Sequence, residues 1–314
     1  MILVTGATGC LGANLVERLA PERPVRVLVR DEGKLRAMLG DVPVEVALGD
    51  LTDRQIVMDA AAGAETILHT AVMNYGAPGF SASHSAEVNR TAMRNVLDAA
   101  HRTGAHVIFS SSQSAYGVPV HSPMREDHPL SGKGPYSASK VECEAMVMEA
   151  WRERGVPVSI FRLPGFHGRH LTQPSMMKQL DRVVSGRTLA IPRSKGRWDF
   201  ASADDMVAGM IAAIGTPASH GLAFNLPGSG PIKPVEYFRL WAEVSDSGAR
   251  VMDLPKATMN VAALFIPEVK EHLYFFSHDI LLDGTRAKDV LGWEPRDTYE
   301  EGIGTTVEWM RSRA

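Results

Sequence analysis

The sequence predicts an α/β fold, a Rossmann-type doubly wound parallel sheet with a smaller C-terminal substrate lobe. Two observations lead to this prediction. Short apolar, β-branched runs alternate with helix-like segments through the first half of the 314 residues, a pattern typical of a parallel sheet covered by helices on both faces. The first of these runs leads directly into a glycine-rich turn and a helix, as in dinucleotide-binding folds.

The expected elements follow one another in this alternation. The expected strands are residues 2–4, 25–29, 44–47, 66–69, 106–109 and 158–162. The expected helices are residues 10–19, 54–62, 86–102 and 137–154. A sheet of this kind binds ligands at the carboxyl ends of its strands, so the segments after each strand are the places to look for a site.

The glycine-rich turn joins the first strand to the first helix. Its three glycines are spaced so that the backbone can adopt unusual angles and approach a pyrophosphate closely. The helix that follows presents free N–H groups to the phosphates. A turn without a ligand is the alternative, but the strand before and the helix after favour a dinucleotide. The expected contacts are Gly6, Thr8, Gly9, Cys10, Leu11 and Gly12.

The end of the second strand bears on the choice of dinucleotide. A carboxylate about 20 residues after the glycines would bind the ribose 2′-OH of NAD. Arg30 stands there instead, and a guanidinium matches a 2′-phosphate in charge and geometry. We therefore expect NADP(H). The alternative is NAD(H), with Arg30 in solvent and Asp31 on the ribose.

The regular alternation loosens after Arg162, where Pro164, Gly165 and Gly168 interrupt it. We expect a loop-rich lobe here that closes over the nicotinamide end. A helix near 203–214 and a strand at 222–226 are expected to return to the main sheet. The expected division is therefore a Rossmann domain of residues 1–166 plus about 199–227, and a substrate lobe of about 167–198 plus 228–314.

Composition and charge limit the classes of function. The chain is 45% hydrophobic and 22% charged, as is usual for a soluble globular protein. The net charge of −3 gives no reason to expect nucleic acid, and the longest apolar run, near 261–266, is too short to span a membrane. Cys10 and Cys143 fall in expected helices, which fits a reducing cytoplasm without disulfides. His167 and His170 lack ligand partners at metal-site spacing, so no metal is expected.

Tyr136 and Lys140 lie one helical turn apart in the segment 136–140. The lysine charge is expected to lower the pKa of the phenol from about 10 and to contact the nicotinamide ribose. Such a tyrosine can give a proton to a carbonyl oxygen, or take one from an alcohol, while hydride moves to or from the nicotinamide. The alternative is an ordinary amphipathic helix with a surface lysine.

Three serines follow the fifth strand at the carboxyl edge of the sheet. One of them is expected to help Tyr136 polarise the carbonyl, and we assign this role to Ser112, with Ser111 as the second choice. Turn or capping roles are the alternative for these hydroxyls. Asp50 and Leu51 follow the third strand and, with Thr70 and Ala71 after the fourth, should line the cofactor site.

On these motifs the chain resembles the extended short-chain dehydrogenases/reductases, a family of NAD(P)-dependent epimerases, dehydratases and ketone reductases. The matching segments are residues 5–12, 49–51, 88–89, 109–117, 136–140, 199–205, 224–226 and 286–295. The resemblance implies that Ser112, Tyr136 and Lys140 form the catalytic set and that Asp50 and Leu51 lie near the adenine. Asn89, Leu163 and Gly165 are further expected cofactor contacts.

The resemblance also implies a homodimer built from the helices around 86–102 and 137–154. Departures from the family pattern carry information on the substrate. Gln113-Ser114 replaces the Asp-Glu of sugar-nucleotide dehydratases, so the acid and base for eliminating water are missing. Trp198 replaces an arginine that sugar-nucleotide epimerases use for a diphosphate, although Arg193 and Arg197 are close enough in sequence to substitute for it. The segment 274–279 resembles branches that act on less polar ketones and hydroxysteroid-like alcohols.

The sequence therefore predicts an NADP(H)-dependent oxidoreductase that interconverts a carbonyl and a secondary alcohol of a small-molecule substrate. The expected substrate contacts are Met73, Tyr75, Gln113, His167 and Trp198. One alternative is a nucleotide-sugar epimerase with a tightly bound cofactor. Another is a non-catalytic NADP-binding sensor, which would not need the general acid that Tyr136 provides.

Overall fold

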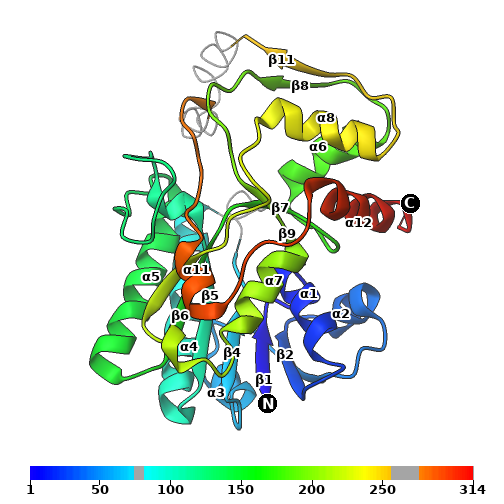
Figure 1. The fold of residues 1–314 in the computed structure, drawn as a ribbon. Helices are drawn as coiled ribbons and strands as arrows, with labels where there is room; N and C mark the ends of the chain where they lie inside the picture. The colour runs from blue at the N-terminus through cyan, green and yellow to red at the C-terminus, as the bar shows by residue number, and fades with distance from the viewer. Residues whose placement is uncertain (74–80, 256–275, 314) are drawn as a thin grey trace.

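A parallel sheet forms the centre of the computed structural model, which describes residues 1–73, 81–255 and 276–313 (Figure 1). Within this part of the chain the sheet has seven strands in the order β10-β6-β5-β4-β1-β2-β3. The strands are β1 Ile2–Thr5, β2 Val25–Val29, β3 Glu45–Leu48, β4 Thr66–His69, β5 His106–Ser112, β6 Val158–Leu163 and β10 Leu222–Asn225. The order reverses between β1 and β4, as in a doubly wound fold.

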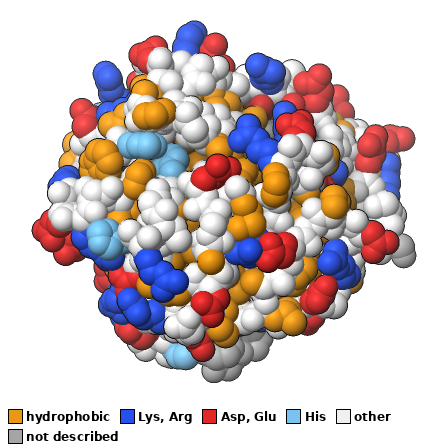
Figure 2. Space-filling model, turned by 90° about the horizontal axis from the view of Figure 1, so that it is seen from below, with side chains coloured by type: hydrophobic (Ala, Val, Ile, Leu, Met, Phe, Trp, Pro, Cys, Tyr) orange, Lys and Arg blue, Asp and Glu red, His pale blue; other side chains and the backbone are white. Residues whose placement is uncertain are grey.

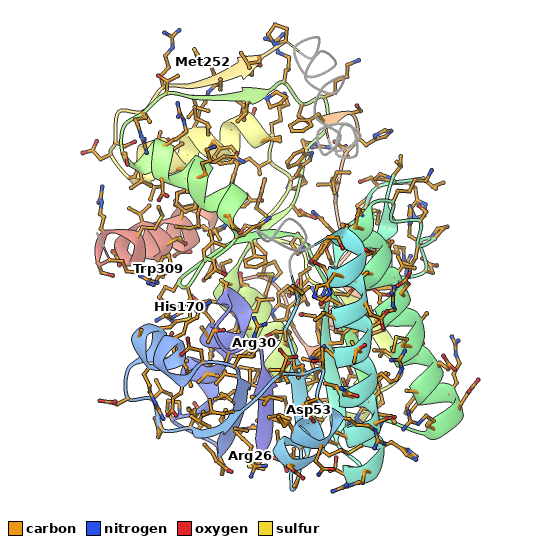
Figure 3. All side chains as sticks on the ribbon, turned by 180° about the vertical axis from the view of Figure 1, so that it is seen from behind. Arg26, Arg30, Asp53, His170, Met252 and Trp309 are labelled. Carbon is orange, nitrogen blue, oxygen red and sulfur yellow. The ribbon has the colours of Figure 1, made fainter. Side chains whose placement is uncertain are left out.

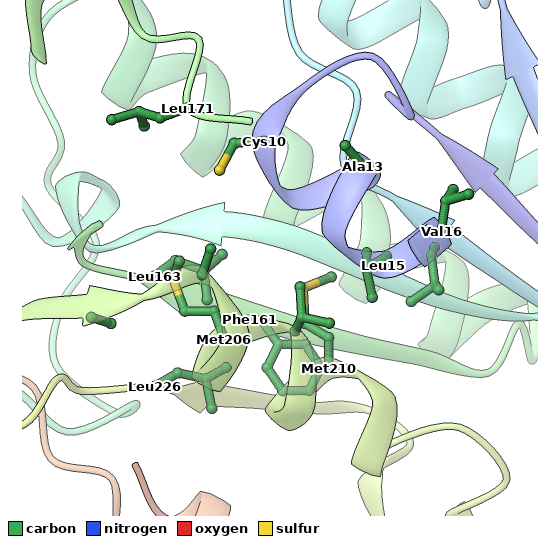
Figure 4. Close-up of a cluster of buried hydrophobic side chains, with 14 of the residues drawn as sticks. Cys10, Ala13, Leu15, Val16, Phe161, Leu163, Leu171, Met206, Met210 and Leu226 are labelled. Atoms are coloured by element: carbon green, nitrogen blue, oxygen red, sulfur yellow. The ribbon is translucent and has the colours of Figure 1, made fainter. Parts of the chain in front are cut away.

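Helices cover both faces of the sheet, because successive strand residues point to opposite sides. In β1, Ile2 and Val4 pack into the apolar core under α1, α2 and α7, whereas Leu3 packs into the core under α3, α4 and α5. The helices are α1 Cys10–Leu19, α2 Glu32–Leu39, α3 Arg54–Ala60, α4 Ala82–Thr103, α5 Pro135–Arg154 and α7 Ala203–Ala212. Figure 4 shows the first core, where Leu15, Phe161 and Met210 lie together.

The second part of the fold lies beyond the carboxyl ends of the strands (Figure 1). It contains two small parallel sheets, in which β7 pairs with β9 and β8 with β11. Its strands are β7 Gly165–His167, β8 Leu189–Pro192, β9 Phe200–Ser202 and β11 Val251–Leu254. Its helices are α6 Pro174–Val184, α8 Pro234–Val244 and α12 Tyr299–Arg311. This lobe is therefore more regular than the loop-rich segment expected from its prolines, and both α6 and α8 begin with a proline, which suits the first helical position.

The path of the chain after residue 227 differs from the expected division. The strand β10 and the helix α7 return to the main sheet as expected, but α11 (Thr285–Leu291) also packs there. Arg286 donates a hydrogen bond to the Ala223 carbonyl, and the Trp293 indole donates one to the Asp205 carbonyl. The chain thus crosses back to the Rossmann part before α12 ends in the lobe, so 228–314 is not a single lobe segment.

Two short 3₁₀ helices, η1 Gln113–Tyr116 and η2 Pro217–Ser219, complete the described elements. In the part of the chain that the structure describes, no helix is both long and apolar enough to cross a membrane. The face seen from below in Figure 2 carries basic and acidic side chains intermixed with apolar ones.

Candidate active site

The turn between β1 and the start of α1 requires glycine at positions 6 and 12. Gly6 has a φ of +77°, and a Cβ there would lie 2.6 Å from the Ala71 backbone nitrogen. A Cβ on Gly12 would lie 2.2 Å from the Gly6 carbonyl oxygen. Gly9 caps α1 without a side chain and donates its N–H to Gly6. The first turn of α1 therefore leaves backbone N–H groups and space for a phosphate, and the residues present fit a dinucleotide.

The Cys10 side chain points away from the glycine turn. Its thiol donates a hydrogen bond to the Arg169 carbonyl at 3.1 Å, and Asn14 donates to the same oxygen at 2.9 Å. Cys10 and Leu171 both belong to the buried cluster shown in Figure 4. Burial raises the pKa of the Cys10 thiol, so it stays protonated. Any cofactor contact from Cys10 is thus made by its backbone, and its side chain ties α1 to the segment that follows β7.

Two charged residues at the end of β2, Arg30 and Asp31, have different surroundings. Arg30 is exposed, with Nη1 3.7 Å from a carboxylate oxygen of Asp50, and Figure 3 shows it at the lobe-facing end of the strand. Asp31 instead caps α2 by accepting a hydrogen bond from the Lys34 backbone N–H at 2.9 Å. Asp50 also accepts two hydrogen bonds from Thr52, which contribute with Arg30 to lowering its pKa against the opposing effect of burial. Arg30 is therefore the more exposed side chain of the Arg30–Asp50 pair, and Asp31 is exposed but bonded to the start of α2.

Two asparagines of α4 fix the segments after β3 and β4. Asn89 accepts a hydrogen bond from the Met73 N–H at 2.8 Å and donates one to the Met73 carbonyl. Asn95 donates to the Leu51 carbonyl at 2.8 Å. Asn89 is thus a buried support for the backbone beside the expected site. Asn95 was not predicted, because a single amide in a helix carries no distinctive spacing.

The end of β4 is tied to the end of β1. The Thr70 hydroxyl donates to the Thr5 carbonyl at 2.7 Å, and the Thr5 hydroxyl lies 2.8 Å from His69 Nδ1. Burial, and next the nearby Lys140 charge, lower the pKa of His69 to about 3, so the imidazole is neutral at physiological pH. These contacts hold the strand ends beside the glycine turn.

Lys140 is buried beneath the start of α5, with 5% of its surface exposed. Its ammonium donates to the Ser110 carbonyl at 2.7 Å and lies 4.8 Å from the centre of the Phe109 ring. The centre of the Tyr136 ring is 5.8 Å away. Burial lowers the pKa of Lys140 to about 8. The alternative of a surface lysine is therefore wrong, and the lysine charge lies close to the phenol ring.

The three serines at the end of β5 have different partners. Ser111 is buried and donates its hydroxyl to the Glu144 carboxylate. Ser112, the last residue of β5, is partly exposed and accepts a hydrogen bond from the Ser114 N–H at 3.2 Å. A hydroxyl that accepts one bond still has its own hydrogen to donate. The geometry thus favours Ser112 over Ser111 for a contact with substrate.

The junction between β6 and β7 carries two expected cofactor contacts. Leu163 ends β6 with its side chain buried, which leaves its backbone for a contact. Gly165 begins β7, where a Cβ would lie 3.1 Å from the Phe200 ring.

The expected substrate contacts differ in their burial and in their partners. Met73 is partly exposed at the end of the segment after β4, and Tyr75 lies outside the described residues. Gln113 is half-buried in η1, and its Oε1 has no hydrogen-bond partner among the described residues. Trp198 is half-buried between aromatic rings, with its ring centre 5.1 Å from that of Phe276 and 6.0 Å from that of Phe200.

His167 does not lie where a substrate contact was expected. Its imidazole is 1% exposed, and Nδ1 lies 3.1 Å from the Tyr237 hydroxyl. Trp241 packs on its edge, and a Cβ on Gly302 would lie 2.5 Å from Nε2. Burial lowers the pKa of His167 to about 3. The residue belongs to the lobe core, since β7 turns its side chain inward. Among the described residues, no group of three His, Cys, Asp or Glu side chains could hold a metal ion.

Comparisons with known proteins agree with this geometry. The sequence model of the NAD dependent epimerase/dehydratase family matches residues 2–226. Sterol demethylase protein B of Methylococcus capsulatus is 29% identical over 333 residues, which are 99% of this chain and 98% of that protein. A dTDP-glucose 4,6-dehydratase of Streptomyces antibioticus is 25% identical over 330 residues, covering 99% and 92%. The crystal structure of UDP-glucose 4-epimerase from Thermotoga maritima aligns with a TM-score of 0.83 at 22% identity, covering 99% of both chains.

Proposed function

The chain belongs to the NAD-dependent epimerase/dehydratase family, and we propose that within this enzyme family it is an NADP(H)-dependent oxidoreductase that interconverts a carbonyl and a secondary alcohol. The observation that supports this most is the placement of Lys140. Its ammonium is buried, bonded to the Ser110 carbonyl and close to the Tyr136 ring, and Ser112 is two residues further along the same strand.

The chain's own residues would act as follows. The nicotinamide, when bound, supplies or accepts a hydride. Tyr136 gives a proton to the carbonyl oxygen as it becomes an alcohol, and takes that proton back in the reverse direction. Ser112 donates its O–H to the same oxygen, which polarises the carbonyl. Lys140, in its charged form, makes the phenol a better acid by favouring the tyrosinate that remains.

The preference for NADP(H) is supported by the end of β2. Arg30 is exposed, its ion pair with Asp50 is long at 3.7 Å, and exposed ion pairs of this kind contribute little. It can therefore turn to a 2′-phosphate. Asp31, the residue that would bind the ribose of NAD, already caps α2.

A less polar substrate is supported by the surroundings of Trp198. The two arginines near it in sequence are already paired, since Arg193 Nε lies 2.7 Å from Asp253 and Arg197 Nη2 lies 3.5 Å from Asp279. Both pairs are exposed and so hold these guanidinium groups only weakly, and the support for a less polar substrate comes instead from the aromatic rings around Trp198. A relative at 29% identity is a sterol demethylase protein, and this too favours an apolar alcohol or ketone.

The second candidate is a nucleotide-sugar epimerase, which uses the same hydride step twice without net oxidation. It is favoured by a relative at 28% identity over 330 residues, the UDP-glucose 4-epimerase of Mycolicibacterium smegmatis. One screen separates the two candidates. The purified protein is incubated with NADPH and either ketones, aldehydes, or UDP- and GDP-sugars. Consumption of NADPH with a ketone supports the oxidoreductase. Interconversion of sugars without consumption of NADPH overturns it in favour of the epimerase.

We also infer a homodimer that uses the outer faces of α4 and α5. The two helices pack side by side, and Arg90 of α4 pairs with Glu142 of α5 at 2.7 Å. Light scattering tests this, and a monomer at micromolar concentration would contradict it.

A further inference from the structure

The helix α5 presents three functional side chains at intervals of four residues. Tyr136, Lys140 and Glu144 therefore lie on one face of the helix, one turn apart. This face is turned toward the end of β5, because Lys140 bonds to the carbonyl of Ser110 and Glu144 bonds to the hydroxyl of Ser111. Two consecutive strand residues are thus linked to two consecutive helical turns. The next residue along the strand is Ser112.

Glu144 is held on its other side by Arg162. Arg162 Nε and Nη2 both donate to the Glu144 carboxylate, at 3.1 and 2.8 Å. The side chains are almost fully buried, with 3% of Glu144 and 7% of Arg162 exposed. Arg162 on β6 is the direct neighbour of Ser111 on β5 in the strand register. The carboxylate therefore bridges two adjacent strands as well as the helix.

The far side of the Arg162 guanidinium holds the end of η1. Its Nη1 donates to the Tyr116 hydroxyl at 2.9 Å and to the Glu126 carbonyl at 2.8 Å. The segment that begins after Ser111 and ends at Tyr116 is thus fixed at both ends by the same ion pair. Ser112 lies inside this segment.

We propose that Glu144, held by Arg162, is a positioning residue for the reaction, which fixes Ser112 opposite Tyr136 so that both hydroxyls meet one substrate oxygen. This deepens the proposed function and rests on it. Ser112 is positioned through its neighbours. Its place is set because Ser111 on one side and Tyr116 on the other are both anchored.

A role in stability alone explains the pair poorly. Taking two charges out of water is unfavourable, and replacing a buried ion pair by apolar residues of similar size is often neutral or stabilising. What such a pair does supply is a fixed geometry, because a bidentate arginine and carboxylate have one preferred arrangement. At this place in the fold, that geometry is the spacing between α5 and the end of β5.

The Glu144 carboxylate also acts on Lys140 through its charge. Burial lowers the pKa of Lys140 to about 8, and Glu144, one turn away, opposes that effect together with Cys143. Among the described residues, Tyr136 on α5 and the neutral His69 on β4 also face the ammonium. Removing the Glu144 charge should therefore bring the loss of the Lys140 proton to a lower pH.

The first test compares Ser111→Ala with Ser159→Ala. Both serines are buried in neighbouring strands and hydrogen-bonded, but Ser159 contacts His106 and Ser219 at the opposite end of β6. Small misplacements of reacting groups can lower rates by up to about 10²-fold. We expect Ser111→Ala to lower kcat about tenfold on this basis, less than Ser112→Ala, with KM and the Kd for NADPH unchanged. Ser159→Ala should leave kcat unchanged. An unaltered kcat in Ser111→Ala, or an equal loss in both variants, overturns the proposal.

The second test follows the pH dependence of kcat/KM in the reductive direction. Glu144→Gln should move the fall in kcat/KM to lower pH, because Lys140 loses its proton earlier when the Glu144 charge is gone, whereas Ser159→Ala should leave the profile in place. If no carbonyl is turned over, the proposed function fails. If the enzyme turns over and a folded Glu144→Gln protein keeps both its kcat and its pH profile, the positioning role of Glu144 fails. If that variant does not fold, the Ser111→Ala comparison decides.

Discussion

Replacing Arg30 by alanine should weaken NADPH and leave NADH unaffected. Arg30 is 77% exposed at its side chain, and its nearest carboxylate, that of Asp50, is 3.7 Å away. Removing the Arg30 guanidinium should therefore lower the stability of the cofactor-free protein very little, since exposed ion pairs contribute about 0–1 kcal/mol. A hydrogen bond between charged partners contributes about 1.5–3 kcal/mol. The expected loss of NADPH affinity is thus about 10- to 150-fold.

The assay is a fluorescence titration of both cofactors against the protein and two variants, Arg30→Ala and Arg54→Ala. Arg54 is a matched control, because it is also an exposed arginine but bonds to Asp98 at 3.2 Å. Arg54→Ala should change neither affinity. The same loss for NADH as for NADPH would refute the reasoning, because only NADPH carries the 2′-phosphate. Tighter binding of NADH by the unaltered protein would refute it as well.

Four further outcomes are expected. Tyr136→Phe should keep NADPH affinity and lose about 10²–10⁴-fold in kcat; a kcat near that of the unaltered enzyme would contradict the role of the phenol. Gly12→Ala should abolish cofactor binding in titrations, since its Cβ would lie 2.2 Å from the Gly6 carbonyl oxygen. In the reductive direction, kcat/KM should fall as pH rises through about 8, where Lys140 loses its proton; a flat pH profile would contradict a role for the Lys140 charge. No 4-keto-6-deoxy product should form from any nucleotide sugar, because Gln113 offers no acid.

Most strands of the main sheet could be predicted because they are buried on both faces and rich in apolar residues, whereas β3, at the edge of the sheet, is exposed at both ends. The helix 10–19 and the strands 25–29 and 66–69 have the predicted bounds. The lobe was predicted less well. Its strands are short, three residues each in β7 and β9, and a run of that length carries no periodicity.

The proximity of Tyr136 and Lys140 could be predicted because both residues lie on one helix, where a spacing of four residues is visible in the sequence. The partners of Glu144 could not, because Ser111 is 33 residues away and Arg162 18 residues away. Only the strand register brings these two together. The burial of His167 was missed for a related reason: its position after a strand resembles that of a site residue, whereas its side chain faces Tyr237 and the lobe core.

The two candidate reactions share their proton and hydride chemistry, so the catalytic residues cannot separate them. Under the proposed function, two parts of this chain would separate them. At the expected adenine end, an exposed Arg30 favours a cofactor that carries a 2′-phosphate. Trp198, the expected substrate contact, packs near Phe200 and Phe276, and these aromatic rings offer an apolar molecule more contact than they offer a diphosphate. Both features support the proposed enzyme, which would exchange its cofactor and interconvert an apolar carbonyl and its alcohol.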